Sequence, residues 1–168
     1  MSEVITRPAP AFAQRFAAFV CAGDVITCAY GPFTVSARIV PDDCPDPPDQ
    51  RRDGFWPSLN RDAPGFIGPG NNFRERFAEA QAKAEAIMAG WRRGDWFYCG
   101  VVLSVCVDDV VLVASAASLW GIEANYPETD NAYLAEIACG LLPEAVAAGQ
   151  AALDRLAGLA SSGEGDAP

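Results

Sequence analysis

Hydrophobic positions follow two different periods along the chain, and the alternation between them predicts the elements. Phe12, Phe16, Phe19 and Val20 recur at helical spacing and predict a short helix over residues 11–21. Residues 24–40 alternate in the manner of a strand pair broken at Gly31-Pro32. This start of the chain therefore predicts a helix followed by a β-hairpin.

The same succession returns in the second half of the chain. An apolar stripe predicts a helix that begins after Asn72, acting as its cap, and ends at Gly90 or Gly94. Valine-rich runs at 96–107 and 110–117 flank Asp108-Asp109 and predict a second hairpin. A last helix is expected from about Asp130, with a kink or break at Pro143.

Residues 41–72 have no sustained period and are rich in Pro, Gly, Asp and Asn, which predicts a long loop. The loop carries Phe55 and Trp56, and we expect these to anchor it, either against this domain or against a partner.

The order of these elements predicts an α+β fold. We expect helices packed against an antiparallel sheet of about four strands, in the order α-ββ-loop-α-ββ-α. We predict one domain over residues 1–160 and a flexible tail over 161–168.

Composition excludes several functional classes. The sequence contains no histidine, so Ser-His-Asp and Cys-His catalysis and imidazole metal ligation are impossible. The net charge of −10 disfavours direct binding to nucleic acid or to an anionic membrane. Phosphate-loop, dinucleotide-binding and hydrolase-elbow motifs are absent. No leader or membrane span is recognised, so a cytoplasmic location is expected.

Cysteines and acidic residues give no strong metal signal. The six cysteines form no C-x-x-C pair and are expected to be reduced thiols, with Cys44 as the candidate for reactivity. The acidic run that begins at Asp42 and Asp43 and ends at Asp53 lacks the spacing of a calcium loop. We therefore assign no metal, no cofactor and no catalytic residue.

A compact aromatic and acidic corner lies between the second hairpin and the last helix. Trp120, Glu123, Asn125, Tyr126 and Glu128 are its candidate residues. Paired carboxylates beside aromatics are typical of some enzyme sites, so a small enzyme is the alternative hypothesis. In that alternative, Glu123–Glu128 would combine with acids of the 42–53 run in one pocket.

Three segments carry a resemblance: ASLWGIEANYPETDNAYLAEIACGLLPEAV, WFYCGVVLSV and FTVSARIVPDD. Together they resemble an uncharacterised family of small proteins found on plasmids, prophages and other mobile elements of proteobacteria. The resemblance implies a genomic setting rather than residue roles. Small acidic proteins in that setting are often inhibitors of host defence.

The leading hypothesis is a non-enzymatic protein-binding factor of a mobile element, in its most concrete form an anti-CRISPR or anti-restriction inhibitor. Its acidic surface would engage a basic partner protein, either a host complex or one encoded by the element. The predicted contact residues are those of the loop and of the corner: Asp42, Asp43, Phe55, Trp56, Trp120, Glu123, Asn125, Tyr126 and Glu128. The sequence leaves the oligomeric state open.

Overall fold

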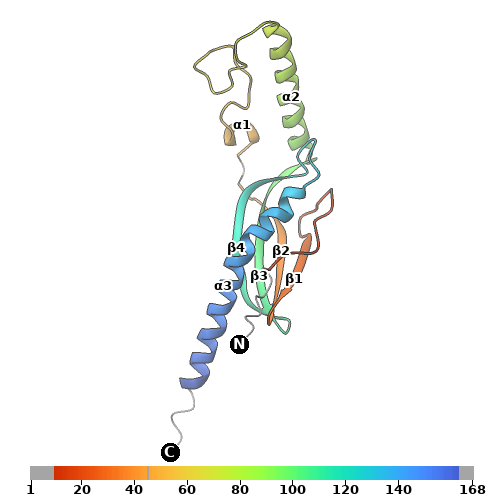
Figure 1. Cartoon of the computed structure of the whole chain (residues 1–168). Coiled ribbons are helices and arrows are strands. Elements are labelled where there is room, and N and C mark those ends of the chain that lie inside the picture. Colours follow the sequence, from red (N-terminus) through yellow and green to blue (C-terminus); the bar gives the residue numbers. More distant parts are fainter. Residues whose placement is uncertain (1–9, 45, 163–168) are drawn as a thin grey trace, which may run out of the picture. The chain divides into compact units, whose positions relative to one another are not determined.

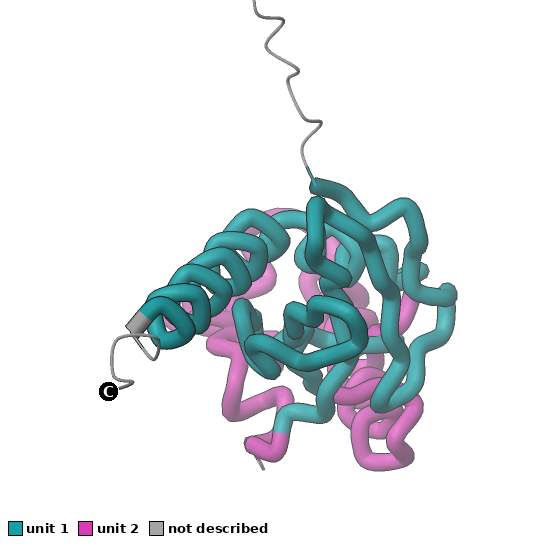
Figure 2. The backbone as a smooth tube through the Cα atoms, turned by 90° about the horizontal axis from the view of Figure 1, so that it is seen from below, with its two compact units in different colours: residues 1–42, 98–125, 129–168 teal, residues 43–97, 126–128 magenta. Residues whose placement is uncertain are grey.

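The computed structural model describes residues 10–44 and 46–162 and shows an α+β protein. Its backbone separates into two compact units, coloured separately in Figure 2. Unit 1 comprises Met1–Asp42, Tyr98–Asn125 and Thr129–Pro168, and unit 2 comprises Asp43–Phe97 and Tyr126–Glu128. The sequence led us to expect a single domain, whereas the contacts gather in these two units.

A four-stranded antiparallel sheet runs in the order β1-β2-β3-β4. The strands are β1 (Val25–Tyr30), β2 (Phe33–Pro41), β3 (Phe97–Val107) and β4 (Val110–Ala124). Both predicted hairpins are confirmed, with turns at Gly31-Pro32 and at Asp108-Asp109. Both aspartates have positive φ, as the tight turn between adjacent strands requires.

Strand β4 is seven residues longer than expected, because the sequence pattern placed its end at Ala117. The added residues include Leu119, Trp120 and Ile122, which favour extended structure. The indole of Trp120 lies over Gly100 of β3, where an added Cβ would come within 2.5 Å of the ring. A glycine on the neighbouring strand therefore makes room for this aromatic side chain.

One face of the sheet forms the core of unit 1. Alternate residues of β2 and β3 are buried and lie opposite one another, as in the pairs Val35–Val105 and Ile39–Val101. Helix α3 (Ala132–Ser162) crosses this face (Figure 1). Its Gly149 lies so close to the sheet that an added Cβ would be 2.7 Å from Cγ1 of Val105.

Helix α3 runs through Pro143 without the expected break. Pro143 is exposed, whereas Leu142 and Ala145 beside it are fully buried, so packing on the sheet maintains the helix across the missing hydrogen bond. The helix also includes the first two residues of the predicted tail, and residues 163–168 lie outside the described residues.

Within the described part of the chain, α3 is one helix that is long and apolar enough to cross a membrane by length and composition. About a third of its most apolar window, 33%, is buried inside the protein. A core helix of this length passes the same test, and the first half of α3 covers the sheet.

The helix predicted over residues 11–21 is wrong, because the described part of this segment is irregular. The side chain of Asn125 accepts from the backbone N–H of Val20 (2.9 Å) and donates to its carbonyl (2.8 Å). The amide of Asn131 donates to the carbonyl of Ala18 (2.8 Å). A helix of this length is marginal alone, so these tertiary partners determine the backbone instead.

Unit 2 contains helices α1 (Pro48–Arg51) and α2 (Phe73–Arg93). Helix α2 confirms the predicted helix, and it ends at Gly94 with N–H groups of Gly94 and Asp95 bonded to the carbonyls of Trp91 and Gly90. Asn72 precedes the helix in a left-handed conformation and makes no side-chain cap, contrary to expectation.

All six cysteines are free thiols. Cys44 is exposed as expected, and Cys21 is exposed as well. Burial raises the pKa of Cys28, and burial together with the negative charge of Asp42 raises the pKa of Cys99 to about 11. A high thiol pKa disfavours the reactive thiolate, so the exposed cysteines are the accessible ones for modification.

Candidate functional site

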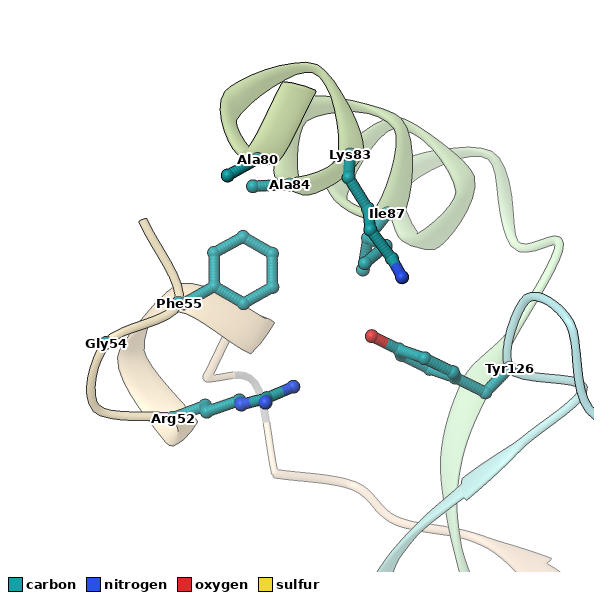
Figure 3. Close-up of a pocket in the computed structure, with 8 residues that line it drawn as sticks. All are labelled: Arg52, Gly54, Phe55, Ala80, Lys83, Ala84, Ile87 and Tyr126. Atoms are coloured by element: carbon teal, nitrogen blue, oxygen red, sulfur yellow. The ribbon is translucent and has the colours of Figure 1, made fainter. Parts of the chain in front are cut away.

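A pocket of about 310 Å³ lies between α2 and the preceding loop within unit 2 (Figure 3). We call it the α2 pocket. Its lining combines three hydrogen-bonding side chains with an apolar wall: Arg52, Gly54, Phe55, Ala80, Lys83, Ala84, Ile87 and Tyr126. This volume is at the small end of the range for small-molecule sites, about 300–1,000 Å³.

Helix α2 supplies one wall of the α2 pocket by simple helical spacing. Ala80, Ala84 and Ile87 recur at i, i+4 and i+7 and therefore share one face of the helix. Lys83 lies on the same face, and its ammonium group points into the cavity in Figure 3. The two alanines are small, so they leave open the space in which the lysine and a ligand could lie.

The loop wall is shaped by two glycines where the backbone approaches itself. Gly54 has φ +73°, and a Cβ there would lie 2.6 Å from the carbonyl oxygen of Pro64. A Cβ on Gly65 would lie 2.0 Å from the carbonyl oxygen of Trp56. Only glycine permits this close approach, which turns the loop back so that Phe55 faces α2.

Tyr126 is positioned by a buried tryptophan. Its ring packs edge-to-face on Trp96, with ring centroids 5.0 Å apart and an interplanar angle of 73°. The indole N–H of Trp96 donates to the carbonyl of Ile87 (3.0 Å) on α2. In Figure 3 the Tyr126 hydroxyl is directed toward the cavity. The phenol is therefore part of a fixed aromatic pair.

The polar lining of the α2 pocket consists of the Arg52 guanidinium, the Lys83 ammonium and the Tyr126 hydroxyl, and among the described residues no carboxylate lines it. Within the described residues Arg52 makes no ion pair. Lys83 lies 3.8 Å from a carboxylate oxygen of Glu128, and both side chains are largely exposed (69% and 82%). Such a contact contributes little, so the pocket retains its positive character.

A second hollow of about 290 Å³, which we call the loop groove, lies where the loop meets the start of α2. Its lining is entirely uncharged: Leu59, Phe66, Ile67, Gly68, Pro69, Gly70 and Phe73. Arg76 of α2 fixes the backbone that forms this groove. Its guanidinium donates to the carbonyls of Ile67 (2.9 Å), Gly68 (3.4 Å) and Asn71 (3.2 Å). The groove therefore has an ordered backbone beneath an apolar surface.

The predicted residues Phe55, Trp56, Tyr126 and Glu128 all lie in unit 2. Phe55 and Tyr126 line the α2 pocket, and Glu128 is the partner of its lysine. Trp56 packs edge-to-face on Phe55 with centroids 5.2 Å apart, and its indole N–H donates to Asp49 (3.2 Å). Phe55 thus packs against this unit, while Trp56 remains 40% exposed.

The other predicted residues are not brought to this pocket. Asp42, Trp120, Glu123 and Asn125 belong to unit 1, and Asp43 is exposed at the start of unit 2. The side chain of Asn125 makes two hydrogen bonds to the backbone of Val20, so its role is structural. The backbone carbonyl of Glu123 accepts from the hydroxyl of Tyr133.

The residues of the alternative enzyme hypothesis are divided between the units, with Glu123 in unit 1 and Glu128 in unit 2. Among the residues that the structure describes, no three histidine, cysteine or acidic side chains are close enough to hold a metal ion. Around these two glutamates, the described residues therefore offer no set of metal ligands.

Sequence reasoning missed Arg52, Lys83 and Ile87 as members of one site. Signals did exist: Lys83 is the single lysine of the chain, and Arg51-Arg52 is one of its few adjacent basic pairs. Lys83 lies one helical turn after Glu79, a spacing typical of a solvated ion pair, whereas the structure directs it toward Glu128 and the α2 pocket. No family model, curated protein or solved structure matches this chain.

Proposed function

We propose that the protein is a non-enzymatic protein-binding factor of a mobile element that attaches to a partner protein through unit 2. Its contact surface is the rim of the loop groove together with Trp56. The resemblance to proteins of plasmids and prophages supports this genomic setting. An inhibitor of a host defence complex is the most specific form of the proposal.

The observation that carries the proposal is a set of large apolar side chains left exposed on an ordered loop and at the first residue of α2. Trp56, Leu59 and Phe73 are 40%, 54% and 48% exposed. Leu59 and Phe73 flank the loop groove, and Trp56 precedes it in the same loop. Large exposed apolar side chains beside a hollow are typical of protein interaction sites.

The loop that presents Trp56 and Leu59 is held by backbone hydrogen bonds as well as by Arg76. The N–H of Ser58 donates to the carbonyl of Gly65 (2.8 Å), and the N–H of Ile67 donates to the carbonyl of Ser58 (3.1 Å). A preordered loop loses little conformational entropy when it binds, so its exposed aromatics can contribute more to affinity.

Charge favours a basic partner. The chain carries a net charge of −10. Unit 1 contains twelve acidic and four basic residues, whereas unit 2 contains ten acidic and eight basic ones. The strongly acidic unit would attract a basic protein during encounter, and the apolar rim of unit 2 would supply the close contact.

The test is affinity capture from a proteobacterial host with three versions of the protein. Wild type and Leu156→Ala should recover the same basic protein, and Trp56→Ala with Phe73→Ala should lose it. Leu156 is the matched control because it is an exposed apolar residue of unit 1 (52%) outside the proposed surface. Truncation of a central aromatic contact typically costs about 2 kcal/mol or more in binding.

The electrostatic attraction of a basic partner can be measured separately, through the association rate. The association rate should fall steeply as salt is raised, because it depends on long-range charge. Recovery of the same partner by the double variant would contradict the assigned surface. Failure of wild type to recover any basic partner, with unchanged phage plating when the gene is expressed, would contradict the function.

A further inference from the structure

The α2 pocket brings three hydrogen-bond donors of different elements to one small cavity. Arg52 comes from the end of the α1 turn, Lys83 from α2 and Tyr126 from the segment after β4. Figure 3 shows the guanidinium, the ammonium and the phenol hydroxyl directed toward the same space. Guanidinium and ammonium groups donate and do not accept, so the site is suited to an oxyanion.

The rest of the lining is apolar. The Phe55 ring lies opposite Tyr126 in Figure 3, and the faces of Ala80, Ala84 and Ile87 complete the wall. A hydrated inorganic anion would make no use of these surfaces. An anionic group attached to a ring or a branched apolar body would use both parts of the pocket, because burial of apolar surface adds to the charge-assisted hydrogen bonds.

We propose that the α2 pocket binds a small organic oxyanion, a carboxylate or a phosphate ester carried on an aromatic or branched apolar body. Arg52 and Lys83 hold the oxyanion, and Phe55 and Tyr126 line the apolar body beside it. This proposal is independent of the protein-binding function, since it concerns a different cavity of unit 2 and needs no partner.

The local charge of the pocket supports this ligand class. Unit 2 contains ten acidic and eight basic residues, but the charged side chains among the described lining of the pocket are the two cations Arg52 and Lys83. In the absence of ligand, Glu128 lies 3.8 Å from Lys83 and acts as a loose internal counter-ion. A ligand oxyanion would compete with it for the ammonium group, so Glu128 is expected to limit affinity.

Binding is tested on the whole protein with four probes: benzoate, phenyl phosphate, inorganic phosphate and benzyl alcohol. Titration calorimetry and tryptophan emission provide two readouts, and Trp96, which packs on Tyr126, is one of the four emitting residues. Benzoate or phenyl phosphate should bind saturably with a Kd of about 1 mM or tighter, and whichever is tighter identifies the oxyanion. Inorganic phosphate and benzyl alcohol should each bind at least about tenfold more weakly.

Variants locate the site. Arg52→Gln and Lys83→Gln should each weaken the preferred probe by about tenfold, since each removes a charge-assisted hydrogen bond. Arg92→Gln, an exposed arginine of α2 outside the pocket, is the matched control and should have no effect. Glu128→Gln should strengthen binding a few-fold by removing the competing carboxylate.

Three results would overturn the proposal. Absence of saturable binding of both aromatic anions up to about 10 mM would exclude the ligand class. Equal binding of benzyl alcohol would show that the charged donors play no part. An equal loss in Arg92→Gln would show unspecific ionic attraction rather than this pocket. None of these results would bear on partner capture by Trp56 and Phe73.

Discussion

Trp96 holds Tyr126 in place through an edge-to-face contact, with ring centroids 5.0 Å apart. Trp96 is itself 1% exposed and is tied to α2 by its hydrogen bond to the carbonyl of Ile87. Gly90 makes room for the indole, since a Cβ there would come within 3.3 Å of it. One buried side chain thus links α2 to the tyrosine of the candidate pocket.

The first prediction concerns this link. Trp96→Phe keeps an aromatic ring but leaves the buried carbonyl of Ile87 without its indole donor. The cost should be about 1–3 kcal/mol, and each kcal/mol should lower Tm by about 2–4 °C in a thermal melt. Trp120→Phe is the control, because the Trp120 side chain is half-exposed and its indole N–H donates to the hydroxyl of Ser118, an exposed bond. Equal losses in the two variants would show that the buried hydrogen bond is unimportant.

The fold was predictable where local pattern and packing agree. The two hairpins and α2 combine strong periodicity with turn or end residues, and the structure reproduces them. The segment 11–21 failed because its helical spacing of phenylalanines competes with tertiary hydrogen bonds from Asn125 and Asn131. These two residues lie more than a hundred positions away, so no local pattern could reveal them.

The candidate site was predictable only in part, for a related reason. Phe55 and Tyr126 stood out as aromatics in polar surroundings, and both line the α2 pocket. Arg52 and Lys83 did not, because a lone cation on a helix or loop is ordinarily a solvated side chain. They form a site because the loop turns back at Gly54 and Gly65. This turn depends on contacts between backbone atoms of residues about ten positions apart, which no local sequence pattern reveals.

The second prediction compares two glycines of the same helix. Gly149→Ala would place a Cβ 2.7 Å from Val105 and 3.3 Å from the ring of Phe33, whereas Gly140→Ala meets nothing within 4 Å. Alanine is favoured over glycine in a helix by about 1 kcal/mol, but overpacking costs about 1–3 kcal/mol. Thermal melts should therefore show Gly140→Ala stabilised and Gly149→Ala destabilised. Stabilisation of both would mean that α3 is not pressed against the sheet.

The third prediction concerns the polar centre of unit 1. Asn131 is 1% exposed; its amide donates to Ala18 and to the side chain of Asn125, and its oxygen accepts from the N–H of Asn125. Asn131→Asp would set a charged oxygen against two acceptors inside the protein. Urea unfolding near neutral pH should show a loss of about 3 kcal/mol or more.

A matched control exists for this change. Asn72 has the same left-handed backbone (φ 58°, against 60° for Asn131) but is exposed and makes no side-chain cap. Asn72→Asp should therefore change stability by less than about 0.5 kcal/mol. The loss in Asn131→Asp should shrink as pH falls, because protonation of the buried carboxyl restores a donor. A loss that is small, or that does not change with pH, would contradict the role assigned to Asn131.

The fourth prediction follows from the pKa of Cys99. Burial, reinforced by the negative charge of Asp42, raises it from 9.0 to about 11. Between these values the unfolded chain has lost the thiol proton and the folded protein has kept it, so folding becomes less favourable as pH rises. The stabilisation is complete below about pH 9 and is lost progressively toward pH 11. Tyr133, whose pKa burial also raises, adds a loss of the same sign above its ordinary value of 10.0.

Cys99→Ala isolates the thiol from the tyrosine. The variant should be less stable than wild type at about pH 8, because a buried atom is lost, and the difference should narrow as pH rises toward about 10.5. Urea unfolding across this interval measures it. Cys44→Ala, which removes an exposed thiol, is the control for the substitution itself and should cost less stability at about pH 8 than Cys99→Ala. A constant difference in Cys99→Ala would mean that Cys99 ionises alike in the folded and unfolded chains, and that its buried position beside Asp42 has no effect on stability at high pH.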